Sequence, residues 1–447
     1  MKIKTVLLIS LMMNLVAYGQ ISTDKIESSV NKDKDKYISI FKDLHQNPEL
    51  GFEETETAKF VADELRSFGY KVTENIGKTG IAAVLKNGSG PTVMYRADMD
   101  ALPVQETTGV DWASTKQVQL ENGTTTYVSH MCGHDAHITW MLQTAQYLAE
   151  NKEDWKGTVV FIGQPAEELI EGARAMVDDG LYDKHKIPQP DYLFGMHTAP
   201  GAVGMVVAGD GPRLAGTDQF DVTFYGVGGH GSAPEKAIDP VVMAANAVMQ
   251  YQTIVNRKID PQHAAVLTVG SIKAGESNNV IPDKAVLKIN LRWFDEEDRK
   301  ILKENIQRIN ESIAYANNLP KDKYPTVVEK GWSYPLENNA NLTDVIRKSI
   351  NSIDEIDFIL TEKMIGPTMG SEDFHHLVID SPKKDTPYSY INIGIIDPDR
   401  FAKSIEETGE PPYYNHNGDY EVDLRALPLG SEIAIHSMLG IFEAYKK

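Results

Sequence analysis

Residues 92–100 read Thr92-Val93-Met94-Tyr95-Arg96-Ala97-Asp98-Met99-Asp100, an apolar run that ends in two aspartates. A short apolar run bounded by polar residues is typical of a buried strand. The pattern recurs where residues 158–162 lead to Gln164-Pro165-Ala166-Glu167-Glu168 and where residues 192–196 lead to His197. Ligands of open α/β sheets bind beyond the carboxyl ends of the strands. The three strand ends are therefore expected to gather Asp98, Asp100, Glu167, Glu168 and His197 in one crevice.

Helical patterns separate these strands. Apolar residues recur at helical spacing in the segment after the first strand end, at Ile138, Met141, Leu142, Ala145 and Leu148. Strands that alternate with helices favour a parallel sheet covered on both faces. We therefore predict an α/β fold, with a mostly parallel central sheet flanked by helices in a phosphorylase/hydrolase-like catalytic domain.

A second pattern interrupts this domain between residues 214 and 328. A chain of 447 residues is too long for one compact core. The order of elements here is strand, helix, strand, strand, helix, over residues 218–225, 240–255, 265–272, 285–293 and 295–317. This order predicts an inserted α+β open-sandwich domain with helices on one face of its sheet. The catalytic domain then comprises residues 20–213 and 329–447.

The first 19 residues have the pattern of a signal peptide. Lys2 and Lys4 precede an apolar stretch over residues 6–16, and Ala17-Tyr18-Gly19 forms a small-x-small cleavage pattern. The stretch is too short to span a bilayer comfortably, and the alternative is a buried N-terminal helix. We expect an exported protein without a membrane span, in the periplasm or outside the cell. The net charge of −20 argues against a nucleic-acid partner.

The segment Met131-Cys132-Gly133-His134-Asp135-Ala136-His137 gathers a thiol, two imidazoles and a carboxylate. Such side chains are ligands of zinc and similar divalent ions. Cys132 is the only cysteine, so an intramolecular disulfide is impossible, and a metal would occupy the thiol. Taken alone, the segment could instead be a polar helix N-terminus.

The adjacent carboxylates Glu167 and Glu168 are the sharpest single signal. Two carboxylates just past a buried strand would repel each other in a bare apolar site. A metal removes the conflict when one carboxylate ligates and the other acts as a general base. The alternative is a solvated acidic turn, which nearby Glu171 would extend.

Several motifs, in order along nearly the whole mature chain, carry a family resemblance. They are RADMDALP at 96–103, MCGHDAH at 131–137, QPAEE at 164–168, the strand end at His197, GGHGSAPE at 228–235, NVIPD at 279–283 and GSEDF at 370–374. Together they resemble the dinuclear metallopeptidase family of aminoacylases, hippurate hydrolases and auxin-conjugate (IAA-amino acid) hydrolases. The resemblance implies two divalent metal ions, zinc or manganese or cobalt.

The resemblance also implies roles for single residues. The metal ligands would be Cys132, His134, Glu168, His197 and His416, with Glu167 as the general base that later protonates the leaving amine. His416 lies in Tyr414-Asn415-His416-Asn417-Gly418, where the family more often has a proline near Gly418. Relatives outside this branch begin the site with His-x-Asp, whereas here Asp98-Met99-Asp100 stands. Asp98, Asp100 and His137 are then expected to orient the ligands rather than bind metal.

The inserted domain would contribute further groups. Glycines flank His230, which in the family reaches the crevice from a partner subunit and polarises the scissile carbonyl. Asn279 is expected to bind polar atoms of the substrate, and Arg292 to clamp a substrate carboxylate. A surface ion pair with Asp295 or Glu296 is the alternative for Arg292. The resemblance implies that the inserted domain, residues 214–328, acts as a lid and in dimerisation, and that the protein is a homodimer.

The resemblance to the hippurate and auxin-conjugate branch implies an amidohydrolase that deacylates N-acyl amino acids. One alternative is a metal-dependent carboxypeptidase or dipeptidase that cuts short peptides. The other is a non-catalytic protein that keeps the fold to bind small acidic ligands, and the presence of both Glu167 and Glu168 argues against it.

Overall fold

The computed structural model describes residues 23–120 and 123–446. The predicted signal peptide, residues 1–19, lies outside the described residues. Within these two ranges, none of the helices combines the length and the apolar content that a bilayer span requires.

The larger sheet has eight strands in the described chain. In spatial order they are β1 (Lys71–Ile76), β2 (Gly80–Asn87), β6 (Gly157–Gln164), β3 (Thr92–Asp98), β7 (Tyr192–Ala202), β18 (Tyr388–Ile396), β8 (Met205–Val207) and β17 (Phe358–Leu360). The central strands β6, β3, β7 and β18 run parallel, and β1 and β2 are antiparallel additions at one edge. The predicted mostly parallel sheet is confirmed.

Helices cover both faces of this sheet because its central strands are apolar on both sides. In β3, Val93 and Tyr95 pack into one hydrophobic cluster and Met94 into another, since successive side chains of a strand point to opposite faces. The first cluster is built with α1 (Thr23–Lys32), α2 (Lys34–Gln46), α3 (Thr55–Ser67), α4 (His134–Glu150), α8 (Ala340–Ile350) and α11 (Ala426–Ala444). The opposite cluster uses α5 (Gly172–Asp178) and α9 (His376–Ile379).

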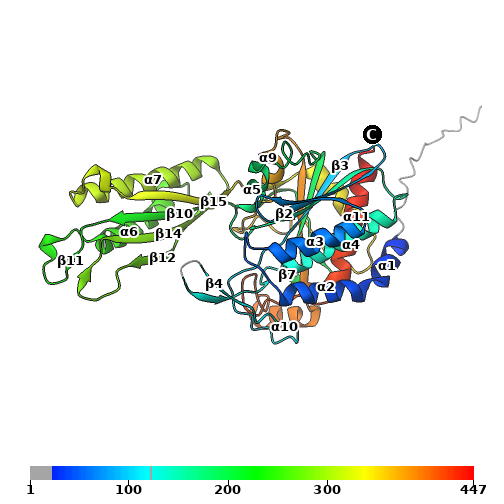
Figure 1. Ribbon diagram of the computed structural model, residues 1–447, viewed down its shortest axis with the longest axis horizontal. Coiled ribbons are helices and arrows are strands. Elements are labelled where there is room, and N and C mark those ends of the chain that lie inside the picture. Colours follow the sequence, from blue (N-terminus) through cyan, green and yellow to red (C-terminus); the bar gives the residue numbers. More distant parts are fainter. Residues whose placement is uncertain (1–22, 121–122, 447) are drawn as a thin grey trace, which may run out of the picture.

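A smaller unit projects from the large one (Figure 1). Its sheet has the order β12 (Val266–Ala274), β14 (Lys284–Trp293), β10 (Gly216–Tyr225) and β15 (Thr326–Ser333). Apolar residues of α6 (Pro240–Lys258) and α7 (Glu296–Ala316) pack on this sheet in a hydrophobic cluster of their own. The sequence pattern did not predict β15, because this edge strand is largely exposed and lacks a regular apolar alternation.

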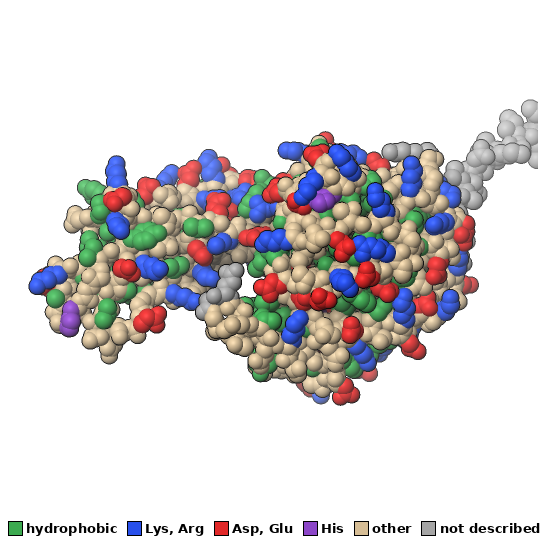
Figure 2. Space-filling model, viewed as in Figure 1, with side chains coloured by type: hydrophobic (Ala, Val, Ile, Leu, Met, Phe, Trp, Pro, Cys, Tyr) green, Lys and Arg blue, Asp and Glu red, His purple; other side chains and the backbone are tan. Residues whose placement is uncertain are grey.

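Short elements complete the described chain. They are the strand pairs β4 (Gln117–Gln119) with β5 (Thr125–Tyr127), β9 (Gly211–Leu214) with β16 (Leu336–Asn338) and β11 (Gly229–His230) with β13 (Val280–Ile281), together with α10 (Pro398–Thr408). Acidic and basic side chains are interspersed over the face that Figure 2 shows.

The two units meet at the end of β15. The Trp332 ring contacts two guanidinium groups, Arg174 of the large unit at 4.4 Å and Arg299 of the small unit at 4.8 Å from its centroid. A β carbon on Gly331 would lie 2.0 Å from the carbonyl oxygen of Leu169, so only glycine fits here. The small unit therefore packs directly against the turn that follows Glu167 and Glu168.

Candidate metal centre

The predicted ligands come from segments that are far apart in the sequence. Cys132 precedes α4, His134 begins it, and Glu168 lies in the turn after β6. Gly133 between the first two has φ +76, and a β carbon there would lie 2.7 Å from the side chain of Thr198. Glycine thus allows Cys132 and His134 to face the same point.

The structure brings all five predicted ligands together. Ligand atoms of Cys132, His134 and Glu168 lie within 4.8 Å of one another. His197 Nε2 lies 3.6 Å from Cys132 Sγ, and His416 Nε2 lies 3.3 Å from Glu168 Oε2. A thiol, three imidazoles and a carboxylate in one cluster form a donor set that suits zinc and related cations.

Two buried atoms of this cluster are unsatisfied. His134 Nε2 and Glu168 Oε1 have no hydrogen-bond partner among the described residues. Buried polar atoms are normally paired, so such orphans need an explanation. His134 Nδ1 lies 3.2 Å from Asp100 Oδ1 and His197 Nδ1 lies 2.7 Å from the carbonyl oxygen of Thr198, so both histidines keep the Nε2 lone pair for a ligand. The residues present therefore fit a bound cation.

The charges around Cys132 favour its thiolate. Burial and the charge of Glu168 would raise the pKa of the thiol, but His197 and His134 outweigh them and lower the pKa to about 6. Burial would also raise the pKa of Glu168, but His416 holds it below its ordinary value. Both groups are thus anionic near neutral pH, which is the form that binds metal.

Asp100 ties two ligands together. Its Oδ1 faces His134 Nδ1, and its Oδ2 accepts a hydrogen bond of 3.0 Å from the backbone N–H of Glu168. Asp98 accepts hydrogen bonds from His137 Nδ1 and, at 2.7 Å, from Arg96. Asp98, His134, His137 and His197 also lie within 4.8 Å of one another. Since Asp98 and His137 already bind other groups, this arrangement supports an orienting role for them.

Glu167 lies beside two further carboxylates, and its Oε2 is 3.9 Å from His134 Nε2. Carboxylate oxygens of Glu167, Glu372 and Asp373 lie within 4.8 Å of one another, and all three side chains are buried. Burial raises the pKa of Glu167 well above its ordinary value, and the charges of Glu372 and Glu168 add to the effect. Glu167 thus holds a proton more readily than a solvated glutamate does.

One buried arginine neutralises part of this charge. Arg96 donates to Glu372 and to Asp98, each at 2.7 Å, and to Gln164 at 2.8 Å, while Tyr390 donates to Glu372. Sequence reasoning singled out the GSEDF motif that contains Glu372 but gave it no role. The motif was the one signal in the sequence that pointed to Glu372. The contact of Glu372 with Arg96 could not be predicted, because it depends on the tertiary fold.

The backbone of His416 is unusual. Its φ is +71, a left-handed conformation that non-glycine residues seldom adopt, and its N–H donates at 2.7 Å to the carbonyl oxygen of Met131. This bond joins the loop that carries His416 to the segment that carries Cys132. Strained backbone that the surrounding structure holds in place is common at functional sites.

The sequence pattern predicted that a strand ends at His197, and this prediction is wrong. β7 continues to Ala202, because β18 pairs with it beyond His197 through Ile393, Gly394 and Ile396. The other neighbour, β3, pairs with β7 only as far as Gly195. His197 therefore lies where one side of the strand loses its partner.

Two predicted residues lie away from the cluster. His230 is in β11, at the end of the small unit farthest from the large sheet (Figure 1), and Asn279 lies beside it, with its carbonyl oxygen 2.8 Å from the N–H of Gly231. Both side chains are exposed. One chain does not bring them to Glu167.

Arg292 lies on β14 of the small unit, where the charge of Glu167 acts on it. Its Nε donates to Asn290 at 2.9 Å, and its buried Nη1 has no hydrogen-bond partner among the described residues. Burial lowers the pKa of Arg292, and the charge of Glu167 opposes that effect. No ion pair with Asp295 or Glu296 forms in the described chain, and Glu296 lies near Arg299 instead. The open guanidinium edge is consistent with a clamp for a carboxylate.

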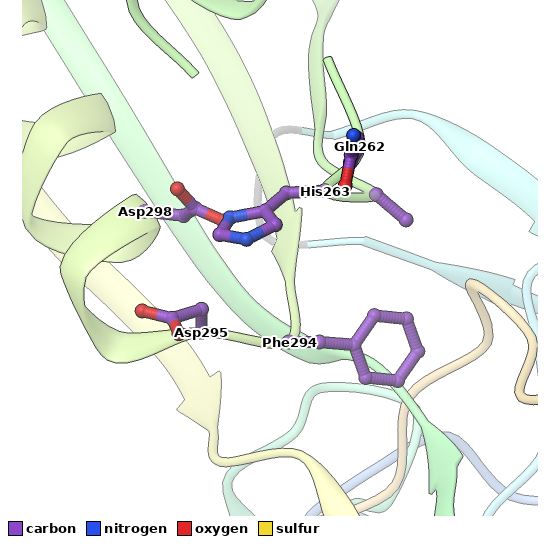
Figure 3. Close-up of a pocket in the computed structure, with 6 residues that line it drawn as sticks. Gln262, His263, Phe294, Asp295 and Asp298 are labelled. Atoms are coloured by element: carbon purple, nitrogen blue, oxygen red, sulfur yellow. The ribbon is translucent and has the colours of Figure 1, made fainter. Parts of the chain in front are cut away.

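A separate cavity of about 310 Å³ lies in the small unit (Figure 3). It is lined by Gln262, His263, Ala264, Phe294, Asp295 and Asp298. His263 Nδ1 contacts Asp298 at 2.8 Å, and none of the lining residues belongs to the clusters described above.

Known proteins are similar to this chain in sequence and in fold. The chain is 40% identical to a hippurate hydrolase of Campylobacter jejuni over 76% of its length and 84% of the relative, and 33% identical to thermostable carboxypeptidase 2 of Saccharolobus solfataricus over 94% and 98%. The YXEP protein of Bacillus subtilis, a dinuclear metal-binding peptidase from the M20 family, superposes with a TM-score of 0.67 at 26% identity over 92% of this chain and 99% of that one.

These similarities confirm the resemblance read from the motifs. Residues 94–409 match the peptidase family M20/M25/M40. The family fold and the cluster of thiol, imidazole and carboxylate ligands agree with each other. The chain therefore belongs to peptidase family M20/M25/M40 and is a metal-dependent amidohydrolase.

Proposed function

We propose that the protein hydrolyses the amide bond of N-acyl amino acids, with Glu167 as the general base. The observation that carries this proposal is that the two adjacent glutamates have different neighbours. Glu168 contacts His416 and belongs to the cluster with Cys132 and His134, whereas Glu167 lies with Glu372 and Asp373. One carboxylate is thus placed to ligate and its neighbour stays free for proton transfer.

The ligands Cys132, His134, Glu168, His197 and His416 would hold two divalent ions. When bound, such ions lower the pKa of water and polarise an amide carbonyl. Glu167 takes the proton of the attacking water and returns it to the departing nitrogen. Its raised pKa supports the first half of this task, because a carboxylate of higher pKa is a stronger proton acceptor.

Arg292 supports a substrate with a free carboxylate next to the scissile amide. A guanidinium with an open, buried edge binds a carboxylate through paired hydrogen bonds. The relatives agree with this substrate class, since a hippurate hydrolase cuts an N-acyl amino acid and a carboxypeptidase cuts beside a terminal carboxylate. The similarity to thermostable carboxypeptidase 2 over nearly the full length keeps peptide cleavage as the second candidate.

The proposal includes a homodimer and export. Exposed apolar side chains on the small unit, among them Met249 at 71% and Val242 at 63% exposure, offer a surface for a second copy. A partner subunit would then supply His230, which one chain holds away from its own Glu167. Export rests on the lysines, apolar stretch and cleavage pattern of residues 1–19.

The experiment pairs elemental analysis with a substrate panel. Purified protein is assayed on acetyl- and benzoyl-amino acids and on dipeptides, with and without chelator, beside Glu167→Gln. We expect chelator-sensitive turnover of N-acyl amino acids, and a Glu167→Gln variant that keeps its metal but loses turnover by about 10³-fold or more. Turnover of dipeptides alone would favour the second candidate, and full activity of Glu167→Gln would refute its role as the base.

A further inference from the structure

The carboxylate of Glu54 is fully buried, in the loop between α2 and α3. Its Oε1 accepts a hydrogen bond of 2.8 Å from the backbone N–H of Ala166, and its Oε2 accepts one of 2.5 Å from the hydroxyl of Thr79. Burying a carboxylate costs free energy unless its oxygens are hydrogen-bonded. Glu54 meets this condition by joining its loop to the turn that follows β6.

Ala166 is the residue directly before the adjacent glutamates. Its φ is +47, which is strained for a residue with a β carbon. Its carbonyl oxygen accepts a hydrogen bond of 3.2 Å from Gly172, so the turn closes on itself behind Glu167 and Glu168. The bond from Glu54 fixes the other end of the same residue. The direction in which Glu167 leaves the chain therefore depends on a conformation that Glu54 helps to hold.

Glu54 does not serve its own helix. It stands at the N-cap of α3, but its side chain makes no capping hydrogen bond. Glu49 does that work instead, since its carboxylate accepts from the backbone N–H of Thr57 at 2.8 Å and of Glu56 at 3.3 Å. Two glutamates of one loop thus have different tasks, one for the helix and one for the turn at the site.

The loop that carries Glu54 is itself fixed to the strand end of the site. The carbonyl oxygen of Glu49 accepts a hydrogen bond of 2.8 Å from Ala101, and Leu50 forms a parallel bridge with Ala101. Ala101 follows Asp100, which holds His134 and the backbone of Glu168. The loop of Glu54 therefore connects the turn that carries Glu167 to the strand end that carries Asp100.

We propose that Glu54 is a positioning residue that holds the Ala166 peptide so that Glu167 faces the scissile amide. The inference rests on the proposed function of Glu167. Glutamine can replace the carboxylate, because its amide oxygen can accept from Ala166 while its amide nitrogen donates to the Thr79 hydroxyl. Alanine loses both bonds, and the strained turn is then free to relax.

The test compares Glu54→Ala, Glu54→Gln and the matched control Glu49→Ala in metal-loaded protein. Metal content, thermal unfolding, and kcat and KM on the best N-acyl amino acid are measured. Glu54→Ala should lose about 10²-fold in kcat, as misplaced catalytic groups do, with KM changed less than about threefold and metal retained. Glu54→Gln should restore kcat to within about fivefold of the parent, because it keeps both hydrogen bonds. Glu49→Ala should lower thermal stability and leave kcat unchanged.

Unchanged kcat in Glu54→Ala, or an equal loss of kcat in Glu49→Ala, would overturn the inference. Should Glu54→Ala fail to fold, Thr79→Val decides, because it frees one oxygen of Glu54; we expect a several-fold fall in kcat, and no fall overturns the inference. Crystals of parent and variant separate this inference from the proposed function. A parent that hydrolyses no substrate refutes the function, while Ala166 that keeps its positive φ without Glu54 refutes the positioning role.

Discussion

The backbone N–H of Thr198 donates a hydrogen bond of 2.9 Å to Nε2 of His137. The other ring nitrogen of His137, Nδ1, donates to Asp98. Both nitrogens are therefore engaged, and His137 has no lone pair for a cation. His134, one helical turn earlier, differs, because its buried Nε2 has no hydrogen-bond partner among the described residues. Two neighbouring histidines of one helix thus differ in whether a ring nitrogen is free to bind a cation.

This difference predicts how metal affinity responds to substitution. His134→Ala removes a ligand and should abolish binding of at least one ion per chain. His137→Gln removes only an orienting group and should weaken binding by about 10- to 100-fold. Titration against a competing chelator measures both. Equal loss of metal in the two variants would contradict the assignment.

The single cysteine predicts a metal-dependent thiol reactivity. In metal-free protein, the rate of alkylation of Cys132 should rise with pH through a midpoint near 6, because His197 and His134 outweigh burial and lower the pKa to about 6. An ordinary thiol has a pKa of about 8.5. Adding zinc should slow alkylation at pH 7 by about 100-fold or more, because the thiolate becomes a ligand. A rate that zinc does not change would place Cys132 outside the centre.

His45 predicts a pH dependence of stability. Burial alone would lower its pKa, but hydrogen bonds of 2.6 Å to Asp135 and 3.1 Å to Glu106 raise the pKa to about 10. The stabilisation is complete below the unfolded pKa of about 6.5 and is lost as pH rises through about 10.

The variant His45→Gln lacks this contribution. At pH 7 its free energy of unfolding should be lower than that of the parent by on the order of 4 kcal/mol, so it should also unfold at a lower temperature. This difference in stability should narrow as pH rises from 7 to 10, because His45 of the parent loses its proton in that range. Thermal unfolding across that range is the measurement. A gap that stays constant with pH would show that His45 is not charged in the folded protein.

The sequence predicted some parts of the fold and of the site and not others. The apolar run before Asp98 predicted a buried parallel strand, and the ligand-type residues Cys132, His134 and Glu168 do lie together. These succeeded because strand period and ligand chemistry are local properties of the chain. The bond between Arg96 and Glu372 joins residues 276 positions apart, and no local pattern encodes it. Glu54 was missed for the same reason, since an acidic residue before a helix reads as an ordinary cap.

The exposed position of His230 predicts complementation between two inactive chains. His230 is exposed in β11 of the small unit, and its Nδ1 accepts a hydrogen bond of 3.1 Å from the backbone N–H of Ser232 in the turn that follows. In a dimer of His230→Ala with Glu167→Gln, one of the two sites combines an intact Glu167 with an intact His230. Random mixing of the two chains should therefore recover about a quarter of the parent activity. Each variant alone is the control, and an inactive mixture would refute a contribution from the partner subunit.

The proposed function depends on two cations that residues distant in sequence would hold together. A crystal of zinc-loaded protein, measured at the zinc absorption edge, tests it most directly. We predict two anomalous peaks per chain, within about 2.0–2.4 Å of ligand atoms from Cys132, His134, Glu168, His197 and His416. Peaks elsewhere, or a loaded crystal in which these side chains bind no ion, would contradict the central claim.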